Sequence, residues 1–221
     1  MKILCVIPVL PGDLNEGTIE SILKQTVPVT EILITSRRTR GKTVSQRVSR
    51  NLNLGLAGVE LACYDYLLRV DGDTVLPRNF VEENLRDKPD LCGSAGCAML
   101  IKTEPFLRVM GGKFHSESDD SYTGYAFMRA GCRVMDWKVK PKMLRPPGNY
   151  HGPRYFLDRG RFMWCLGYEP LHVLASFRWQ TRNVIAVFGY FAALLRREKK
   201  FDVADFVWAR QVEKLWRLKF K

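Results

Sequence analysis

Short apolar runs alternate along the first third of the chain with segments of helical spacing, and this alternation restricts the fold more than any other feature. Residues 2–8, 31–35 and 67–70 are rich in leucine and β-branched side chains, which is typical of strands buried in a sheet. Residues 18–25 and the segment that carries Val44, Val48 and Leu52 lie between them and have the spacing of helices. The order strand, helix, strand, helix, strand predicts an α/β fold, with a mostly parallel sheet flanked by helices.

The middle of the chain continues this pattern. We expect a helix, a strand, a glycine-bearing loop, a second helix that ends at Gly131 and a further strand, over residues 80–85, 97–102, 110–114, 121–130 and 133–139. Pro, Gly, Tyr and His then gather in residues 146–153, which marks a loop at the end of the sheet. The sequence therefore predicts a sheet domain over residues 1–155 and a basic helical C-terminal segment over residues 156–221.

The amino-acid composition limits the classes of protein to which this chain can belong. The 221 residues are 46% hydrophobic, which excludes a disordered chain and favours one main domain with an appended segment. The 35 Lys and Arg exceed the 23 Asp and Glu by 12, which favours polyanions, acidic lipids or phosphate-bearing small molecules as partners. Pro8 and Pro11 interrupt the N-terminal apolar run, so no signal peptide is expected. The longest apolar stretch without charge, near residues 183–195, is shorter than the roughly 18–20 residues that span a bilayer.

The six cysteines show no metal-binding spacing. They form no C-x-x-C pair and no cluster with histidine, and they lie in apolar contexts. We expect buried thiols in a reducing compartment, with a Cys92–Cys97 disulfide as the alternative.

Two carboxylates follow the third predicted strand, where Asp71 and Asp73 flank Gly72. In a parallel sheet, ligands bind beyond the carboxyl ends of the strands, so this turn is expected to line a site. Mg²⁺ and Mn²⁺ prefer such oxygen ligands and commonly share their coordination with substrate phosphates. The alternative is an acidic turn that only precedes the next helix.

Several motifs occur together in one order, namely ILCVIPVL, TIESILKQT, RNLNLGLAGVELACYDYLLRVDGD, GGKF, and Asp119-Asp120 followed by Arg129-Ala130-Gly131. In this combination the sequence resembles family 2 glycosyltransferases, which are inverting enzymes that transfer a sugar from a nucleotide diphosphate donor. The resemblance extends from residue 2 to about residue 151. It implies a GT-A (Rossmann-like) fold.

The resemblance also implies roles for the acidic residues. Asp71 and Asp73 would bind the donor diphosphate through Mn²⁺ or Mg²⁺, with Asp73 as the direct ligand. Asp120 would be the general base that deprotonates the acceptor hydroxyl. Asp119 would keep Asp120 basic or would itself be the base, and the alternative is that both aspartates only cap a helix. His151 would be a further metal ligand, unless it packs in a loop against Tyr150.

Donor contacts are expected from the loops after the first two strands. By analogy, Pro8 and Asp13 would surround the nucleobase and ribose. Arg37 and Lys42 follow the second strand, where the family usually carries acidic residues, and these cations would contact either phosphates or an acidic acceptor. Ala126 occupies a position where the acceptor helix of the family often has arginine. The identity of the acceptor is therefore not inferred from the resemblance.

The expected partners are a UDP- or GDP-sugar donor and an acceptor of the glycan or polyprenyl-phosphate type. The C-terminal segment places Trp208 and Trp216 beside basic residues, which fits either a helix on an anionic membrane surface or a core helix with a solvated basic face. The expected location is therefore cytoplasmic, with attachment to the inner membrane face as an option. A sugar nucleotidyltransferase and a basic nucleic-acid-binding module are the alternative functions, although no nucleic acid partner is expected.

Overall fold

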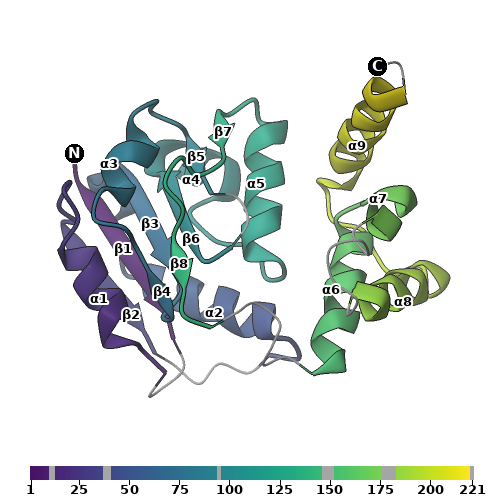
Figure 1. Ribbon diagram of the computed structural model, residues 1–221, viewed down its shortest axis with the longest axis horizontal. Coiled ribbons are helices and arrows are strands. Elements are labelled where there is room, and N and C mark those ends of the chain that lie inside the picture. The colour runs from purple at the N-terminus through teal and green to yellow at the C-terminus, as the bar shows by residue number, and fades with distance from the viewer. Residues whose placement is uncertain (10–12, 37–40, 94–95, 146–151, 176–182, 220–221) are drawn as a thin grey trace. The chain divides into compact units, whose positions relative to one another are not determined.

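The structure is a computed structural model that describes residues 1–9, 13–36, 41–93, 96–145, 152–175 and 183–219. The chain divides into two compact units, Met1–Pro147 and Gly148–Lys221, and each is described by itself (Figure 1).

The first unit is built on a sheet that has six strands within the described residues, in the order β2-β1-β3-β6-β5-β7. These strands are β1 (Ile3–Pro8), β2 (Glu31–Thr35), β3 (Tyr66–Val70), β5 (Leu91–Cys92), β6 (Ala98–Lys102) and β7 (Val134–Met135). β1 pairs in parallel with β2 and β3, and β5 pairs in parallel with β7. β6 lies antiparallel to both β3 and β5, so the sheet is mixed but mostly parallel.

Helices cover both faces of this sheet (Figure 1). They are α1 (Glu16–Leu23), α2 (Val44–Leu56), α3 (Phe80–Leu85), α4 (Thr103–Met110) and α5 (Asp119–Arg129), with a 3₁₀ turn η1 at Leu61–Cys63. A second, two-stranded sheet pairs β4 (Thr74–Val75) antiparallel with β8 (Lys142–Met143).

The side chains of β1 alternate between two hydrophobic clusters. Ile3, Cys5 and Ile7 belong to a cluster that includes Ile22 of α1 and Phe80 of α3. The other cluster contains Leu4 and Val6 of β1 together with Leu52 of α2, Phe106 of α4 and Phe127 of α5. Because both faces of β1 are buried, the strand reads as a continuous apolar run in the sequence.

Local signals fix the ends of several helices. The side chain of Asn15 accepts a hydrogen bond from the Gly17 amide at 2.9 Å at the start of α1, and Thr43 accepts one from the Gln46 amide at 3.1 Å at the start of α2. Gly111 ends α4 with φ 61°, and Gly131 follows α5 with φ 74°. Both glycines adopt the left-handed conformation that terminates helices.

The second unit is helical over its described residues. Its helices are α6 (Pro153–Cys165), α7 (Pro170–Ala175), α8 (Asn183–Leu195) and α9 (Ala204–Lys219). The Tyr190 hydroxyl of α8 donates to the Tyr168 carbonyl at 2.7 Å, and the Phe201 amide donates to the Cys165 carbonyl at 2.7 Å. No helix in the described ranges is both long and apolar enough to cross a membrane.

The expected architecture, an α/β sheet flanked by helices and followed by a helical segment, is confirmed. Details differ from the expectations. α4 was not expected, the strand expected over residues 133–139 is reduced to β7, and β6 is antiparallel. The six cysteines are free thiols, so the Cys92–Cys97 disulfide is not formed, and Cys63 is exposed.

Candidate functional site

The carboxyl ends of β1, β2 and β3 meet at one edge of the sheet. Pro8 at the end of β1 is in register with Thr35 at the end of β2, and Val6 is in register with Arg69 of β3. Asp71, the residue after β3, therefore lies level with Pro8. The buried Asn51 side chain of α2 ties this edge together by donating to the carbonyls of Val9 and Thr35 at 3.1 and 3.0 Å. The sequence pattern gave no signal for this role of Asn51.

The turn Asp71-Gly72-Asp73 is held by contacts around the buried Gly72. The Gly72 carbonyl accepts hydrogen bonds from the Asn15 amide at 3.0 Å and the Thr18 hydroxyl at 3.1 Å. A Cβ at Gly72 would lie 2.3 Å from Val9 Cγ1, closer than real side chains approach. The two flanking side chains remain partly open to solvent, 34% for Asp71 and 30% for Asp73. The fold thus fixes the backbone of the turn and leaves both carboxylates accessible.

Arg69 links this turn to the start of α5. Its side chain is buried, 6% exposed, and its guanidinium Nη2 lies 2.9 Å from Asp71 Oδ1 and 3.3 Å from Asp119 Oδ2. It also donates to the Gly96 carbonyl, just before β6. Arg69 Nε and Asp119 Oδ2 are buried and have no hydrogen-bond partner among the described residues, so the contact with Asp119 is an ion pair only.

Arg69 was missed as a site residue, although the sequence carried a signal. A charged side chain in a strand of otherwise apolar residues is almost always paired when it is buried. The strand YLLRV therefore predicts an acidic partner for Arg69, but the sequence does not say which carboxylate it meets.

The carboxylates share one electrostatic environment. Desolvation raises the pKa of Asp71 to about 6; Arg69 opposes this rise, while the negative charges of Asp73 and Asp120 add to it. Desolvation likewise raises the pKa of Asp119 to about 7, again against Arg69 and with repulsion from Asp120 and Asp71. The raised pKa values of Asp71 and Asp119 show that Arg69 only partly compensates the negative charge gathered at this edge of the sheet.

Asp119 and Asp120 begin α5 but lie in different surroundings. Asp119 is buried, 5% exposed, and faces Arg69. Asp120 is half-buried, and one of its oxygens accepts a hydrogen bond from the adjacent Ser121 amide at 2.6 Å. Asp120 therefore remains the more accessible of the two carboxylates. Ala126, further along the same helix, is buried.

A second arginine approaches the site from the segment after β8. Arg145 pairs with Asp13, and its Nε lies 3.9 Å from Asp73 Oδ2. Nothing in the sequence pattern connects Arg145 with these residues, because more than a hundred positions separate it from Asp13. The contact places Asp13 near Asp73, at the same edge of the sheet.

For the other residues predicted for the site, the structure gives no hydrogen bond or ion pair with Asp71 or Asp73 among the described residues. Pro8 ends β1 at this edge, whereas Lys42 is exposed and its amide donates to Gln46 Oε1 at 2.9 Å, just before α2. Arg37 and His151 lie outside the described residues.

Asp71 and Asp73 of the turn are carboxylates that could hold a metal ion. Within the described part of the chain, no three His, Cys, Asp or Glu side chains gather closely enough to hold an ion by themselves. Arg69 Nη2 lies nearest to Oδ1 of Asp71 and Arg145 Nε to Oδ2 of Asp73, and both carboxylates are partly exposed to solvent. A hard cation that completes its shell with water and phosphate oxygens fits such a set.

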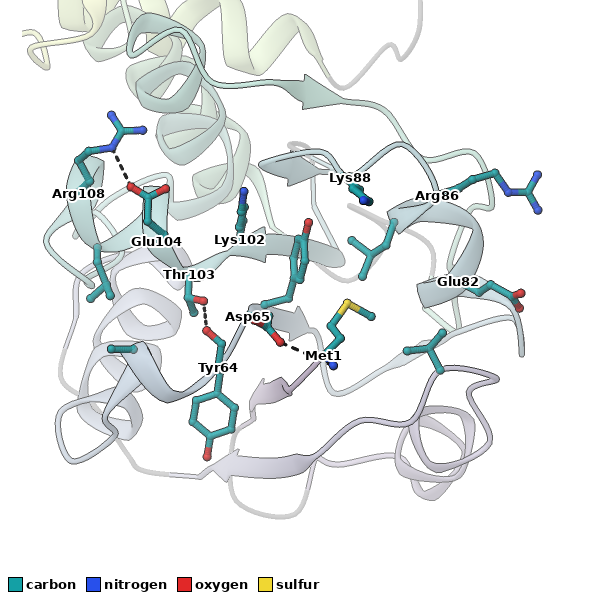
Figure 2. A pocket seen from close by; sticks show the side chains of 15 residues that line it. Met1, Tyr64, Asp65, Glu82, Arg86, Lys88, Lys102, Thr103, Glu104 and Arg108 are labelled. Carbon is teal, nitrogen blue, oxygen red and sulfur yellow. Dashed lines mark hydrogen bonds and ion pairs between the residues drawn. The ribbon is translucent and has the colours of Figure 1, made fainter.

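An open depression of about 1120 Å³ lies at the opposite edge of the sheet, where β1 and β3 begin (Figure 2). Two of the cations that line it are already paired, because Lys102 Nζ lies 3.7 Å from Asp90 and Arg108 Nε lies 3.2 Å from Glu104. The depression contains none of the carboxylates of the turn.

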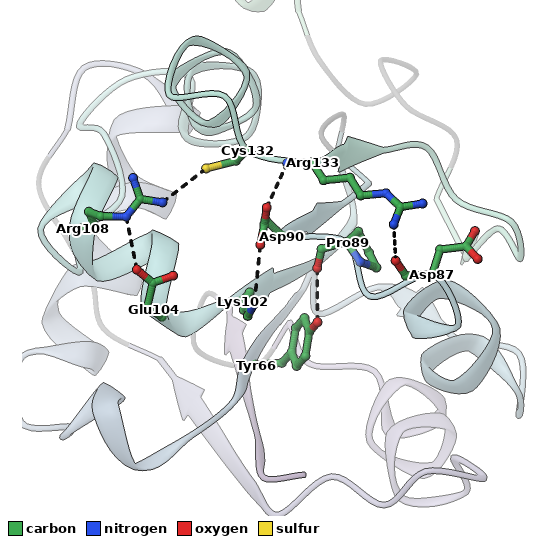
Figure 3. A network of polar contacts seen from close by, with 9 residues as sticks. All are labelled: Tyr66, Asp87, Pro89, Asp90, Lys102, Glu104, Arg108, Cys132 and Arg133. Carbon is green, nitrogen blue, oxygen red and sulfur yellow. Dashed lines mark hydrogen bonds and ion pairs between the residues drawn. The ribbon is translucent and has the colours of Figure 1, made fainter.

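The pairs at the depression belong to a larger polar network, shown in Figure 3. In it, the Arg133 amide donates to Asp90 at 2.9 Å and the Tyr66 hydroxyl donates to the Pro89 carbonyl at 3.2 Å. These contacts connect the segments around β3, β5 and β7, which is a structural role. The candidate site is therefore the edge that carries Asp71 and not the depression.

The chain matches no protein family model and no curated protein. Among solved structures it is similar to A197 from STIV, with 20% identity and a TM-score of 0.46 over 66% of this chain and 87% of A197. It is also similar to a mutant of Drosophila beta-1,4-galactosyltransferase 7 in complex with manganese, UDP-Gal and xylobiose, with 15% identity and a TM-score of 0.46 over 66% of this chain and 71% of the other. A TarS fragment from S. aureus in complex with UDP is 12% identical, with a TM-score of 0.49 over 74% of this chain and 64% of the fragment.

Proposed function

We propose that the sheet unit is an inverting GT-A glycosyltransferase of the family 2 type, which transfers a sugar from a nucleoside diphosphate to an acceptor hydroxyl or phosphate. The observation that supports this most is the pairing of Arg69 with both Asp71 of the turn and Asp119, the residue before Asp120, at the carboxyl edge of the sheet. In open α/β sheets this edge is where ligands bind. Residues 156–221 are proposed to be a helical, basic C-terminal segment attached to this domain.

Asp71 and Asp73 are proposed to hold the divalent ion. The reason is their position on either side of Gly72, together with the partial exposure of both side chains. A bound Mn²⁺ or Mg²⁺ supplies positive charge to the departing diphosphate. Arg69 holds one oxygen of Asp71 and thereby orients the other, and the clamp on Gly72 keeps the two carboxylates at a fixed spacing.

Asp120 is proposed as the general base. In the transfer, Asp120 takes the proton of the acceptor hydroxyl while the acceptor oxygen forms a bond to the anomeric carbon of the sugar. The bond from that carbon to the diphosphate oxygen breaks, and its electron pair leaves with the nucleoside diphosphate. Asp120 suits this role better than Asp119 because it is the more exposed carboxylate and is not paired with Arg69.

Pro8, Asp13 and Lys42 are proposed donor-binding residues, since they lie in or next to the segments that follow β1 and β2. The proposed donor is a UDP- or GDP-sugar, and the proposed acceptor is a glycan or a polyprenyl-phosphate type of molecule. The proposed roles of Arg37 in donor binding and His151 in metal binding rest on the sequence alone.

Calorimetry with UDP and GDP tests the proposal, each titrated in the presence of Mn²⁺ and again in the presence of EDTA. We expect at least one nucleotide to bind only with Mn²⁺, and Asp73→Asn to weaken that binding about tenfold or more. Asp136→Asn is the matched control, because Asp136 is an exposed aspartate of the same unit and lies outside the turn. Failure of both nucleotides to bind, or an unchanged Mn²⁺ dependence in Asp73→Asn, would contradict the proposal.

A further inference from the structure

Helix α8 of the second unit has an unusual composition for a helix of a water-soluble protein. None of its 13 residues, NVIAVFGYFAALL, is charged. A helix that packs on a core with one face normally carries charged and polar residues on the opposite face. α8 therefore presents apolar side chains in every direction, including the direction that faces away from the rest of its unit.

The side of α8 that packs within the unit is made mostly of small residues. Its buried positions include Ala186, Gly189 and Ala193, with Asn183 and Tyr190. At Gly189 a Cβ would lie 2.2 Å from the Leu157 carbonyl oxygen of α6, and at Gly160 of α6 a Cβ would lie 1.7 Å from the Ala186 carbonyl oxygen. The two backbones thus touch directly (Figure 1). Such close contact leaves no room for a side chain at Gly160 or Gly189.

The large apolar side chains of α8 lie on the outer side. Phe188 is 68% exposed and Leu195 is 82% exposed, and Phe191 is also exposed. These residues recur three and four positions apart, so they form one continuous face of the helix. Small residues inside and large apolar residues outside are the reverse of the arrangement that burial from water produces.

Unpaired cations adjoin this outer face. The residues that directly follow α8 include Arg196, Arg197 and Lys199, all of them exposed. Their side chains form no ion pair with any described residue, whereas the neighbouring Glu198 is paired with Arg161. Lys200 lies over the ring of Trp164, 4.5 Å from its centroid. Three uncompensated positive charges therefore stand at the end of an exposed apolar face.

We propose that the outer face of α8, formed by Phe188, Phe191 and Leu195 together with Arg196, Arg197 and Lys199, binds the surface of an anionic lipid bilayer. α8 lies in the plane of the interface with its aromatic and aliphatic side chains among the acyl chains, and the cations contact the headgroup phosphates. The surface expected from sequence centred on Trp208 and Trp216 in α9.

Charge favours an anionic bilayer over a second copy of the chain. Residues 148–221 contain 14 Lys and Arg against 6 Asp and Glu, a net charge of +8. Two such units repel each other when they are brought face to face, whereas anionic headgroups attract them. The inference does not depend on the proposed activity of the sheet unit, because lipid binding is measured without any donor or acceptor.

Flotation of the whole chain with vesicles tests the proposal. Vesicles of an equal mixture of phosphatidylglycerol and phosphatidylcholine are compared with vesicles of phosphatidylcholine alone. We expect binding to the anionic vesicles, weakened about tenfold or more by Phe188→Glu with Leu195→Glu, and weakened similarly by Arg196→Gln with Arg197→Gln and Lys199→Gln. Circular dichroism verifies that each variant is folded.

Leu23→Glu in α1 is the matched control, because Leu23 is 69% exposed, as Phe188 is, but belongs to the sheet unit. It should leave vesicle binding unchanged. Equal binding to neutral vesicles, undiminished binding of the Phe188 and Leu195 variant, or an equal loss in Leu23→Glu would each overturn the proposal. So would light scattering that shows a dimer dissociated by the Phe188 and Leu195 substitutions, since the face would then bind a second copy.

Discussion

Arg69 and Asp119 form a buried ion pair, with 3.3 Å between guanidinium and carboxylate, that joins the end of a central strand to the first residue of α5. The same guanidinium holds Asp71, so the turn proposed to bind the donor and the helix proposed to carry the base share one counter-ion. The relative placement of the two halves of the site therefore depends on a residue that need not touch a substrate.

Arg69→Met should destabilise the fold by about 3 kcal/mol, because removing one partner of a buried ion pair leaves uncompensated charge behind. Urea unfolding measures this loss. Adding Asp119→Asn to Arg69→Met should restore part of the stability, because the double variant no longer has a buried carboxylate at position 119 without its counter-ion. Arg86→Met is the control at an exposed pair with Glu83 and should cost less than about 1 kcal/mol. A loss in Arg69→Met no larger than in the control would contradict the buried pair.

Asp119→Asn should gain stability relative to the wild type as pH rises. Burial raises the pKa of Asp119 from 3.8 to about 7, so between these values the unfolded chain has lost a proton that the folded chain retains. The wild type loses stability across that window, and the amide does not. Melting temperatures from pH 4 to pH 8 measure the difference, which should be smallest near pH 4 and constant above pH 7. Asp136→Asn, at an exposed site, is the control. A difference independent of pH would show that the pKa of Asp119 is not raised.

Gly72→Ala should destabilise the protein by about 1–3 kcal/mol, because the added methyl group would lie 2.3 Å from Val9 Cγ1. It should also weaken binding of a nucleotide with Mn²⁺, since the turn must shift to accept the methyl. Gly58→Ala is the matched control, because no atom lies within 4 Å of a Cβ at that position. Thermal denaturation and calorimetry of the two variants distinguish these expectations. Equal behaviour of the two variants would mean that the turn tolerates a side chain.

Asp120→Asn should lower kcat by about 10²–10⁴-fold and leave the affinity for the nucleotide with Mn²⁺ unchanged, because a base acts on the acceptor proton and not on the diphosphate. Single-turnover transfer and calorimetry measure the two quantities. Asp119→Asn, one residue away, should retain more activity. The reverse result, with transfer lost in Asp119→Asn and retained in Asp120→Asn, would assign the base to Asp119.

The elements whose signal is local were predictable from the sequence. β2 and α3 have the bounds that the pattern predicts, because each is a short periodic segment closed by polar residues or proline. α4 was missed because Pro105 interrupts its apolar spacing, although proline is tolerated in the first turn of a helix. The antiparallel direction of β6 depends on which neighbour it pairs with, and an apolar run carries no information about direction.

In the candidate site, too, the residues with a local sequence signal were predictable and the contacts between distant segments were not. Asp71, Gly72 and Asp73 stand together in the sequence, so one strand and one turn place them. The partners Arg69–Asp119 and Arg145–Asp73 are brought together only by the packing of distant segments, which no local pattern records. The apolar outer side of α8 was visible as composition, but the close backbone contact at Gly160 and Gly189 was not.

The carbonyl of Gly72 receives two donors from the beginning of α1, the Asn15 amide and the Thr18 hydroxyl. These two hydrogen bonds therefore attach the start of the first helix to the backbone of the acidic turn. Loss of either hydrogen bond, for example in Thr18→Val, should therefore loosen the backbone that carries Asp71 and Asp73, although Thr18 contacts neither carboxylate in these hydrogen bonds.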